Sequence, residues 1–473
     1  MQESIYWYDF ETTGINAASD RPIQFAGVRT NLDLEVISEP LNLFTLPSND
    51  IVPNPEAILV TGIDFDHLQK EGSSEVDFCR EIHREFSVPG SCVTGYNSIR
   101  FDDEFSRYLF YRNFFDPYAR EWQHGSSRWD VIDLFRMAYA LRPDGFEWPV
   151  DETGLVSFRL EKLTEANGIG HASAHDAVSD VLATIDVTKK LRDAQPKLYE
   201  YMFALRKKNE VFKQLYPLGK NPVVHVSSMY PARQSCLSVI LPICAHPSNN
   251  NGVICFDLSR DPQPLIDLSS QEIQKRLFTR QEDLGAGIER IALKTIHVNK
   301  CPALAPLSTL KGQEDRLGVD MALCRSHQKR LQKASGLVEK IHEAFLMSQF
   351  DESHDPDLML YQGGFFSDTD RAIMDEIRQS KPESLSVYGA QFQDPRLPEM
   401  LFRYRARNFA HCLNDKEQDL WDQYRSKKLL GENGITSRIE QIQALRNDGR
   451  TDDCLDGLDR YLNLMRDGLP GRK

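Results

Sequence analysis

Two acidic residues interrupt a strand that is otherwise apolar on both faces. Residues 5–10 are predicted to form a buried β-strand, and Asp9 and Glu11 break its apolar character. Residues i and i+2 of a strand project from the same face, so the two carboxylates should lie side by side. Adjacent buried carboxylates repel each other and need a bound cation or a shared proton. Oxygen ligands of this kind suit Mg²⁺ or Mn²⁺ better than zinc.

The sequence around this strand predicts an α/β domain. Between residues 4 and 191, short apolar runs typical of strands mix with runs of helical periodicity. Residues 91–96 are predicted to form a strand, which is followed by a helix with Phe101, Phe105 and Tyr108 at helical spacing. A further helix is expected after Ser173, and residues 193–196 form a candidate junction.

The rest of the chain predicts a β-rich part and then a helical part. Short β-like runs at 223–226, 237–241, 253–256 and 291–297 indicate a small barrel-like or sandwich domain that ends in one charged helix over about 325–347. The polar residues 348–356 suggest a second linker. Residues 358–466 are mostly helical in pattern, and residues 367–370 offer an N-cap with an acidic first turn.

Charge and cysteine usage limit the possible partners and compartments. The chain of 473 residues has 56 Lys and Arg against 70 Asp and Glu, a net charge of −14. It is therefore not expected to coat polyanions by bulk charge, and any nucleic acid must be bound locally. The nine cysteines include no C-x-x-C pair, which favours reduced thiols. Without a signal peptide or an apolar run of about 18 residues, we expect a cytoplasmic protein that does not enter membranes.

Two further acidic motifs follow along the chain. Asp102 would begin a helix directly after a strand, and taken alone it is more simply explained as a helix N-cap. His175 precedes Asp180 by five residues, so on one rigid helix the two would point about 140° apart. A shared site therefore needs His175 on a loop or in a frayed first turn, where it could act as a general base. Taken alone, His175 is more simply a surface histidine.

Together, D-x-E, N-x-x-x-x-D and H-x-x-x-x-D in this order resemble the DEDD 3′→5′ exonucleases of ribonuclease H-like fold, in the His-containing subclass. Further segments extend the resemblance over nearly the whole chain, to the bacterial exonuclease I family. These segments are DRPIQF at 20–25, YRNF at 111–114, SRWD at 127–130, ALRP at 140–143, FRL at 158–160, HVNKCP at 297–302, GFFSD at 364–368 and YRARNF at 404–409.

The resemblance implies a fold and an activity. It implies a ribonuclease H-like nuclease domain with a mixed sheet at residues 1–192, an SH3-like β domain at 196–349 and an all-α C-terminal domain at 352–473. The family arrangement is C-shaped, which would explain processivity. The implied activity is processive 3′→5′ degradation of single-stranded DNA to 5′-mononucleotides, in DNA repair and recombination.

The resemblance also implies roles for the motif residues. Asp9, Glu11, Asp102 and Asp180 match the four carboxylates that hold two Mg²⁺ ions, for which Mn²⁺ is an expected substitute. Asp9 would bridge the ions, Glu11 and Asp180 would serve the ion on the water side, and Asp102 would support the other. His175 would take the proton of the attacking water. A pair of ions roughly 3.5–4 Å apart suits in-line displacement at phosphorus.

Substrate contacts require cations and flat rings within an acidic protein. The resemblance places Arg159 on a substrate phosphate, and Glu11 is expected to contact substrate as well. The other candidates are Arg107, Tyr118, Trp122, Arg128, Arg136 and Lys300. For Tyr118 and Trp122, packing in the core is an equally open explanation.

A protein partner is implied too, and two other functions stay open. The resemblance implies docking of the acidic, aromatic-tipped tail of single-stranded-DNA-binding protein, for which Arg142, Arg316, Arg325 and Arg330 are candidates. Each of these could instead lie on a solvated charged face. We expect a monomer. The alternatives are a DEDD exoribonuclease that acts on RNA 3′ ends, and a non-catalytic nucleic-acid-binding scaffold.

Overall fold

The chain forms two compact units. The computed structural model describes residues 3–170, 176–347, 352–450 and 452–469. Unit 1 comprises Met1–Ser127, His171–Ile185 and Glu352–Lys473, and unit 2 comprises Arg128–Gly170 and Asp186–Asp351. Residues from the far end of the chain therefore belong to the same compact unit as the first strands. Strand β5 (Ser127–Asp130) and helix α7 (Ala177–Ala194) each begin in unit 1 and continue into unit 2.

A mixed sheet forms the centre of unit 1. It contains β1 (Ser4–Thr12), β2 (Pro22–Thr30), β3 (Leu41–Phe44) and β4 (Ser91–Gly95). These strands lie in the order β3-β2-β1-β4, with β1 antiparallel to β2 and parallel to β4. The predicted mixed sheet of an α/β nuclease domain is confirmed, and the first strand is longer at both ends than its apolar run indicates.

The alternation of side chains along β1 separates a core face from an acidic face. Tyr6, Tyr8 and Phe10 point to one side and join an aromatic cluster with Phe25 and Phe86. The odd-numbered residues of β1 project from the opposite face, because side chains alternate along a strand. Asp9 and Glu11 therefore share a face, as the sequence predicts.

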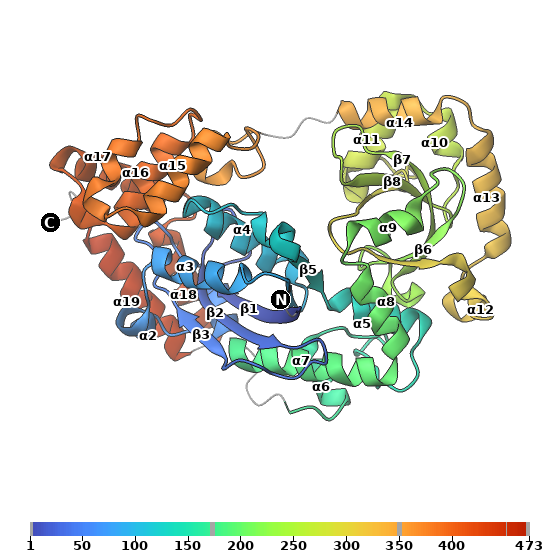
Figure 1. The fold of residues 1–473 in the computed structure, drawn as a ribbon, viewed down its shortest axis with the longest axis horizontal. Coiled ribbons are helices and arrows are strands. Elements are labelled where there is room, and N and C mark those ends of the chain that lie inside the picture. The colour runs from blue at the N-terminus through green and yellow to red at the C-terminus, as the bar shows by residue number, and fades with distance from the viewer. Residues whose placement is uncertain (1–2, 171–175, 348–351, 451, 470–473) are drawn as a thin grey trace. The chain divides into compact units, whose positions relative to one another are not determined.

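Helices from both ends of the sequence cover unit 1 (Figure 1). They are α1 (Pro55–Thr61), α2 (Phe65–Glu71), α3 (Glu75–Phe86), α4 (Asp102–Arg112), α15 (Asp368–Gln379), α16 (Leu397–Asn408), α17 (Asp415–Leu429), α18 (Ile435–Asn447) and α19 (Asp453–Asp467). The C-terminal helices α18 and α19 pack against α1, and α19 also packs against α2. These four helices share one apolar core that includes Ile58, Phe65, Leu445 and Leu458.

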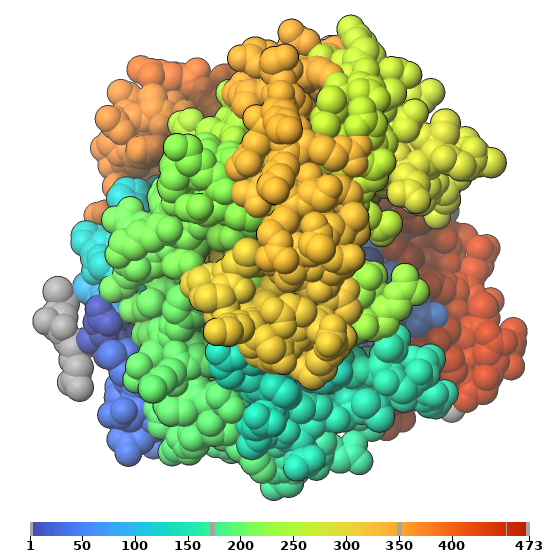
Figure 2. Space-filling model, turned by 90° about the vertical axis from the view of Figure 1, so that its right-hand side faces the viewer, coloured from blue at the N-terminus to red at the C-terminus, as the bar shows by residue number. Residues whose placement is uncertain are grey.

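Unit 2 is built on a five-stranded antiparallel sheet in the order β10-β6-β7-β8-β9. The strands are β6 (Val223–Val226), β7 (Leu237–Ala245), β8 (Gly252–Asp257), β9 (Leu293–His297) and β10 (Ala303–Pro306). The helices are α5 (Ile132–Leu141), α6 (Leu160–Ala166), α8 (Pro196–Ala204), α9 (Lys208–Leu215), α10 (Gln263–Asp267), α11 (Ser270–Phe278), α12 (Glu314–Leu317), α13 (Met321–Lys333) and α14 (Leu337–Leu346). Figure 2 shows the segment from α12 to α14, in gold, as a band across the face turned to the viewer.

One predicted element is wrong and several others are confirmed. The single helix expected over 325–347 is two helices, α13 and α14, because Ala334 after α13 is extended, with ψ 115°, and Gly336 before α14 has a positive φ of 67°. Ser367 caps α15 as predicted, and its side chain accepts a hydrogen bond from the Asp370 amide. All nine cysteines are free thiols. Among the described helices, none is both long and apolar enough to cross a bilayer.

Candidate active site

Three carboxylates meet on the acidic face of β1. Asp9 and Glu11 come from the strand and Asp180 comes from the first turn of α7, and ligand oxygens of all three lie within 4.8 Å of one another. Glu11 is 9% exposed, while Asp9 and Asp180 keep part of their surface in solvent. The structure thus brings together residues that are 171 positions apart, 180 − 9, in the sequence.

A tight turn after β4 brings Asp102 to the same strand. Gly95 ends β4 so close to β1 that a Cβ atom there would lie 2.6 Å from the Tyr8 carbonyl oxygen. Asn97 then takes a left-handed conformation, with φ 63°, which asparagine tolerates better than most residues. Asp102 follows as the first residue of α4, and its Oδ1 accepts a hydrogen bond of 3.2 Å from the Phe10 amide. Asp102 is therefore not the N-cap of α4, a position that Phe101 takes.

Crowding and burial raise the pKa values of these acids. Withdrawal from water raises the pKa of Asp9 to about 8, and the nearby charge of Asp180 adds to the effect. Burial raises the pKa of Glu11 to about 10, with further contributions from Asp9 and Asp180. Burial also raises the pKa of Asp102, which is 3% exposed, and the negative charge of Asp9 adds to this effect. Burial and mutual repulsion disfavour the ionised forms of these oxygen ligands, and a hard divalent cation would relieve both effects.

A buried ion pair between Asp103 and Arg120 lies next to this site and supports it. Asp103, the neighbour of Asp102, accepts hydrogen bonds of 2.6 Å from both the Tyr8 hydroxyl and Arg120 Nη2. Arg120 is 3% exposed, and its guanidinium also donates to Ser106 Oγ at 2.9 Å. These contacts tie the start of α4 to β1. Sequence reasoning misses Arg120, because it lies in a short 3₁₀ turn with no periodicity that would relate it to α4.

The predicted general base lies outside the described residues. His175 belongs to the segment 171–175, and the described chain resumes at Asp176. Asp176 is exposed, and its carboxylate accepts a hydrogen bond of 3.2 Å from the Ser179 amide near the start of α7. The charge of Asp176 also contributes to the raised pKa of Glu11, which places a further acid near this cluster that the sequence did not single out.

The substrate-contact candidates of unit 1 differ in their burial and in their contacts. Arg107 is buried, and its guanidinium donates to Glu104 and Glu121 at 2.8 Å each. Tyr118 is half-buried beneath the Arg107 guanidinium, whose Cζ lies 5.3 Å from the ring centre. Trp122 is 64% exposed, so core packing does not explain this residue.

The remaining substrate-contact candidates belong to unit 2. Arg128 is buried and donates to the Asn299 carbonyl at 2.9 Å, and Arg136 is paired with Asp133 at 2.6 Å. Arg159 is exposed at the N-cap position of α6, and Lys300 is exposed in the turn after β9.

The arginines predicted to hold a partner also lie in unit 2. Arg142 donates to the Leu141 carbonyl and Arg316 to the Ala140 carbonyl, so both guanidiniums bind successive carbonyls at the end of α5. Arg330 is instead paired with Asp261 at 2.8 Å, and Arg325 is exposed on α13.

Comparisons with known proteins match the chain along most of its length. An Exonuclease family model covers residues 6–188, an exonuclease I SH3-like domain model covers 206–347, and an exonuclease I C-terminal domain model covers 354–464. The exodeoxyribonuclease I of Escherichia coli strain K12 is 43% identical over 427 residues, which is 90% of each chain. The chain belongs to the exonuclease I family. Membership in this family implies dependence on a divalent metal.

Solved exonuclease I structures share the whole fold. The E. coli exonuclease I in complex with a dA16 oligonucleotide is 40% identical, with a TM-score of 0.94 over 98% of this chain and 100% of that one. An SSB/exonuclease I structure in complex with the inhibitor CFAM is 39% identical, with a TM-score of 0.90 over 98% and 100%. The predicted order of a nuclease domain, an SH3-like domain and a C-terminal domain is confirmed for this chain.

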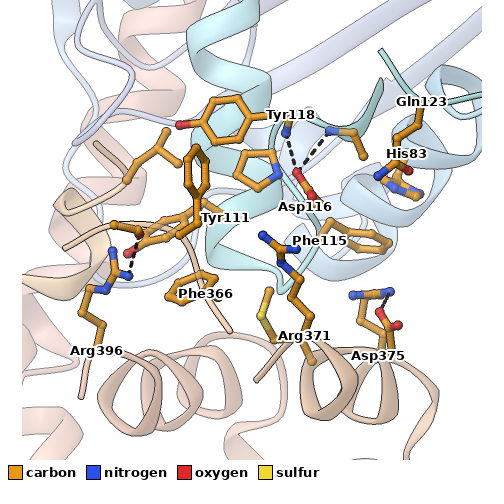
Figure 3. Close-up of a pocket in the computed structure, with 17 residues that line it drawn as sticks. His83, Tyr111, Phe115, Asp116, Tyr118, Gln123, Phe366, Arg371, Asp375 and Arg396 are labelled. Atoms are coloured by element: carbon orange, nitrogen blue, oxygen red, sulfur yellow. Dashed lines mark hydrogen bonds and ion pairs between the residues drawn. The ribbon is translucent and has the colours of Figure 1, made fainter. Parts of the chain in front are cut away.

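A pocket of about 320 Å³ opens in unit 1, and sequence reasoning did not predict it (Figure 3). Its walls include the aromatic residues Tyr111, Phe115, Tyr118 and Phe366. Figure 3 shows Arg371 of α15 extending from the helix towards the centre of the pocket. Phe365, which is 82% exposed, contacts the Tyr118 ring with a centroid distance of 6.0 Å. Unit 1 therefore offers flat rings and a cation in one place.

Proposed function

We propose that this chain removes nucleotides processively from the 3′ end of single-stranded DNA and releases 5′-mononucleotides by hydrolysis that requires two Mg²⁺ ions. The observation that most supports this proposal is the convergence of Asp9, Glu11 and Asp180, with Asp102 hydrogen-bonded to the same strand. Burial and mutual repulsion raise the pKa values of Asp9 and Glu11, and bound divalent cations would relieve this repulsion. The oligonucleotide complex of the E. coli relative supports the choice of substrate.

The four carboxylates would hold the ions, and Mn²⁺ would serve as a substitute for Mg²⁺. When bound, such ions activate water and offset the charge that develops on the departing oxygen. The charge of Asp9 acts on both Glu11 and Asp102, so Asp9 would contribute to both ion positions. We assign His175 as the group that takes the proton of the attacking water, because its ordinary pKa near 6.5 suits neutral operation.

Several groups would hold the strand. Arg159 is exposed and can approach a phosphate, while Trp122 and the pocket beside Tyr118 offer rings for unpaired bases. Arg107, held by Glu104 and Glu121, would act chiefly by fixing the Tyr118 ring. Single-strand binding by such groups should weaken as salt rises.

A single set of digestions tests this function. End-labelled single-stranded DNA, duplex DNA and RNA are incubated with Mg²⁺ or EDTA, with the 3′ or the 5′ end blocked, and Asp180→Ala serves as the inactive control. We expect mononucleotides from single-stranded DNA only when the 3′ end is open and Mg²⁺ is present. Faster loss of RNA would favour the exoribonuclease alternative. Equal products from the Asp180→Ala variant would contradict a role for the acidic cluster.

We also propose that the chain docks the acidic tail of single-stranded-DNA-binding protein at Arg142 and Arg316. Both guanidiniums bind successive carbonyls at the end of α5, and together they could bind a carboxylate-rich peptide. An acidic peptide that ends in an aromatic residue should bind the parent protein and bind Arg316→Ala at least roughly tenfold more weakly. Arg325→Ala is the matched control and should keep its affinity. Unchanged binding by Arg316→Ala would place the tail elsewhere.

The biological role follows from these proposals. A nuclease that joins single-strand digestion to a single-strand-binding partner fits DNA repair and recombination. The monomeric state and the cytoplasmic location stay predictions, and size-exclusion chromatography with light scattering would test the first of them.

A further inference from the structure

A second group of metal-ligating side chains lies in unit 1, away from the acidic face of β1. Glu383 comes from the 3₁₀ helix η8 (Pro382–Tyr388), and His411 and Cys412 come from the 3₁₀ helix η9 (Ala410–Cys412). One ligand atom from each of the three lies within 4.8 Å of the other two. Among the described residues, this is the only such group besides Asp9, Glu11 and Asp180.

The backbone on both sides of this group is held firmly. Both η8 and η9 pack against α16. The Cys412 amide donates to the Phe409 carbonyl at 2.8 Å, and the Cys412 carbonyl accepts from Arg405 Nη2 at 3.3 Å. Arg405 is in turn paired with Glu417, which belongs to the capping box at the start of α17. The segment that carries His411 and Cys412 is therefore fixed by contacts of its backbone.

The three side chains take no part in those contacts. Within the described part of the chain, none of them forms a hydrogen bond or an ion pair with another residue. Glu383 and His411 are exposed, and Cys412 is half-buried, whereas the other eight cysteines are buried. In the described chain, a carboxylate, an imidazole and the one accessible thiol thus lie close together, and their side chains form no hydrogen bond or ion pair that stabilises the fold.

The mixture of ligand types indicates which ion would fit. Sulfur, nitrogen and oxygen ligands together suit Zn²⁺, whereas Mg²⁺ and Ca²⁺ prefer oxygen alone. With Zn–S near 2.3 Å and Zn–N near 2.0 Å, tetrahedral ligands lie roughly 3.3–3.7 Å apart. Rotation of the exposed Glu383 side chain can close the remaining gap. Three protein ligands leave the fourth position to water.

We propose that Glu383, His411 and Cys412 form a zinc site that is separate from the catalytic cluster. A zinc ion there would link η8 to η9 and so fix the two segments that flank α16. This site is independent of the proposed nuclease activity, because no residue in it belongs to the substrate or metal positions assigned above.

Cobalt substitution tests the site directly. Co²⁺ bound by a cysteine thiolate gives a near-ultraviolet charge-transfer band, which an all-oxygen site cannot produce. We expect this band when Co²⁺ is added to the reduced full-length protein, and we expect Zn²⁺ to abolish it by displacement. Cys412→Ser should lack the band while keeping its circular dichroism spectrum and its Mg²⁺-dependent nuclease activity. Absence of the band in the parent protein, or its persistence in Cys412→Ser, would overturn the proposal.

The other two ligands are tested by affinity. His411→Gln and Glu383→Gln should each weaken Zn²⁺ binding by at least roughly tenfold, measured by competition with a chromophoric chelator. His354→Gln changes an exposed histidine of the same unit outside the group, and it should match the parent protein. Unchanged affinity in His411→Gln would show that His411 is not a ligand, which would also overturn the proposal.

Discussion

Neutralising one carboxylate of the active site should stabilise the metal-free protein, and the gain should depend on pH. Asp9→Asn removes a negative charge from the cluster with Glu11 and Asp180 without changing side-chain size. In EDTA, an Asp9 whose folded pKa is near 8 makes folding less favourable once the unfolded chain ionises. The penalty is absent below about pH 4, grows between pH 4 and pH 8, and is complete above pH 8. The Asp9→Asn variant lacks this penalty at every pH.

The size of the gain follows from the pKa of Asp9. Raising a carboxyl pKa from 3.8 to about 8 corresponds to roughly 6 kcal/mol of unfolding free energy for a group fully withdrawn from water. Asp9 keeps part of its surface in solvent, and screening by water reduces the effect. We therefore expect Asp9→Asn to be more stable than the parent by about 1–3 kcal/mol at pH 8 in EDTA.

Urea unfolding at pH 4, 6 and 8 measures this difference. The transition of unit 1 is identified as the one that Mg²⁺ shifts in the parent protein, because a ligand stabilises the state that binds it. Added Mg²⁺ should reverse the order of stability, since the variant has lost a ligand. Asp33→Asn, at an exposed carboxylate, is the matched control. A difference between Asp9→Asn and the parent that stays constant from pH 4 to pH 8 would refute the reasoning.

Three further predictions concern the general base, the buried ion pair and the shared core. His175→Ala should lower turnover by a factor on the order of 10²–10⁴ while calorimetric Mg²⁺ affinity stays close to that of the parent, and full activity would exclude His175 from catalysis. Arg120→Met leaves Asp103 buried without its cation and should destabilise unit 1 by about 3–5 kcal/mol in urea, so a loss below about 1 kcal/mol would contradict this role. Deleting residues 352–473 uncovers Phe65 and should abolish both cooperative unfolding of unit 1 and cleavage, which an active, folded fragment would disprove.

Local periodicity predicts the part of the site that lies within single elements. The two-residue period of a strand is enough to pair Asp9 with Glu11. It cannot show that Asp102 turns towards β1, because the hydrogen bond to the Phe10 amide spans 92 residues of sequence. A carboxylate that directly follows a strand and begins a helix predicts an N-cap, and only the packed structure shows that Phe101 takes that position.

Local periodicity also fails to predict the partners of charged residues and the ends of helices. Arg107 suggests a phosphate contact in the sequence, but Glu104, three residues earlier on the same helix, and Glu121 hold its guanidinium. The first of these partners follows from helical spacing, and the second does not. The break between α13 and α14 lies at Ala334, which is extended, and Gly336, which has a positive φ, and helical spacing on either side does not report it. The packing of α19 against α1 and α2 joins residues nearly 400 positions apart, which no local pattern reports.

The shared core of the first and last helices determines the order in which the enzyme can be completed during synthesis. Unit 2 has all its residues by position 351, whereas unit 1 still lacks residues 352–473. A nascent chain that has been synthesised as far as residue 351 already contains Asp9, Glu11, Asp102 and Asp180. The apolar surface of α1 and α2 is still uncovered at that point. Unit 1 can therefore complete its core only after these C-terminal helices have been synthesised, when unit 2 already has every residue that it needs.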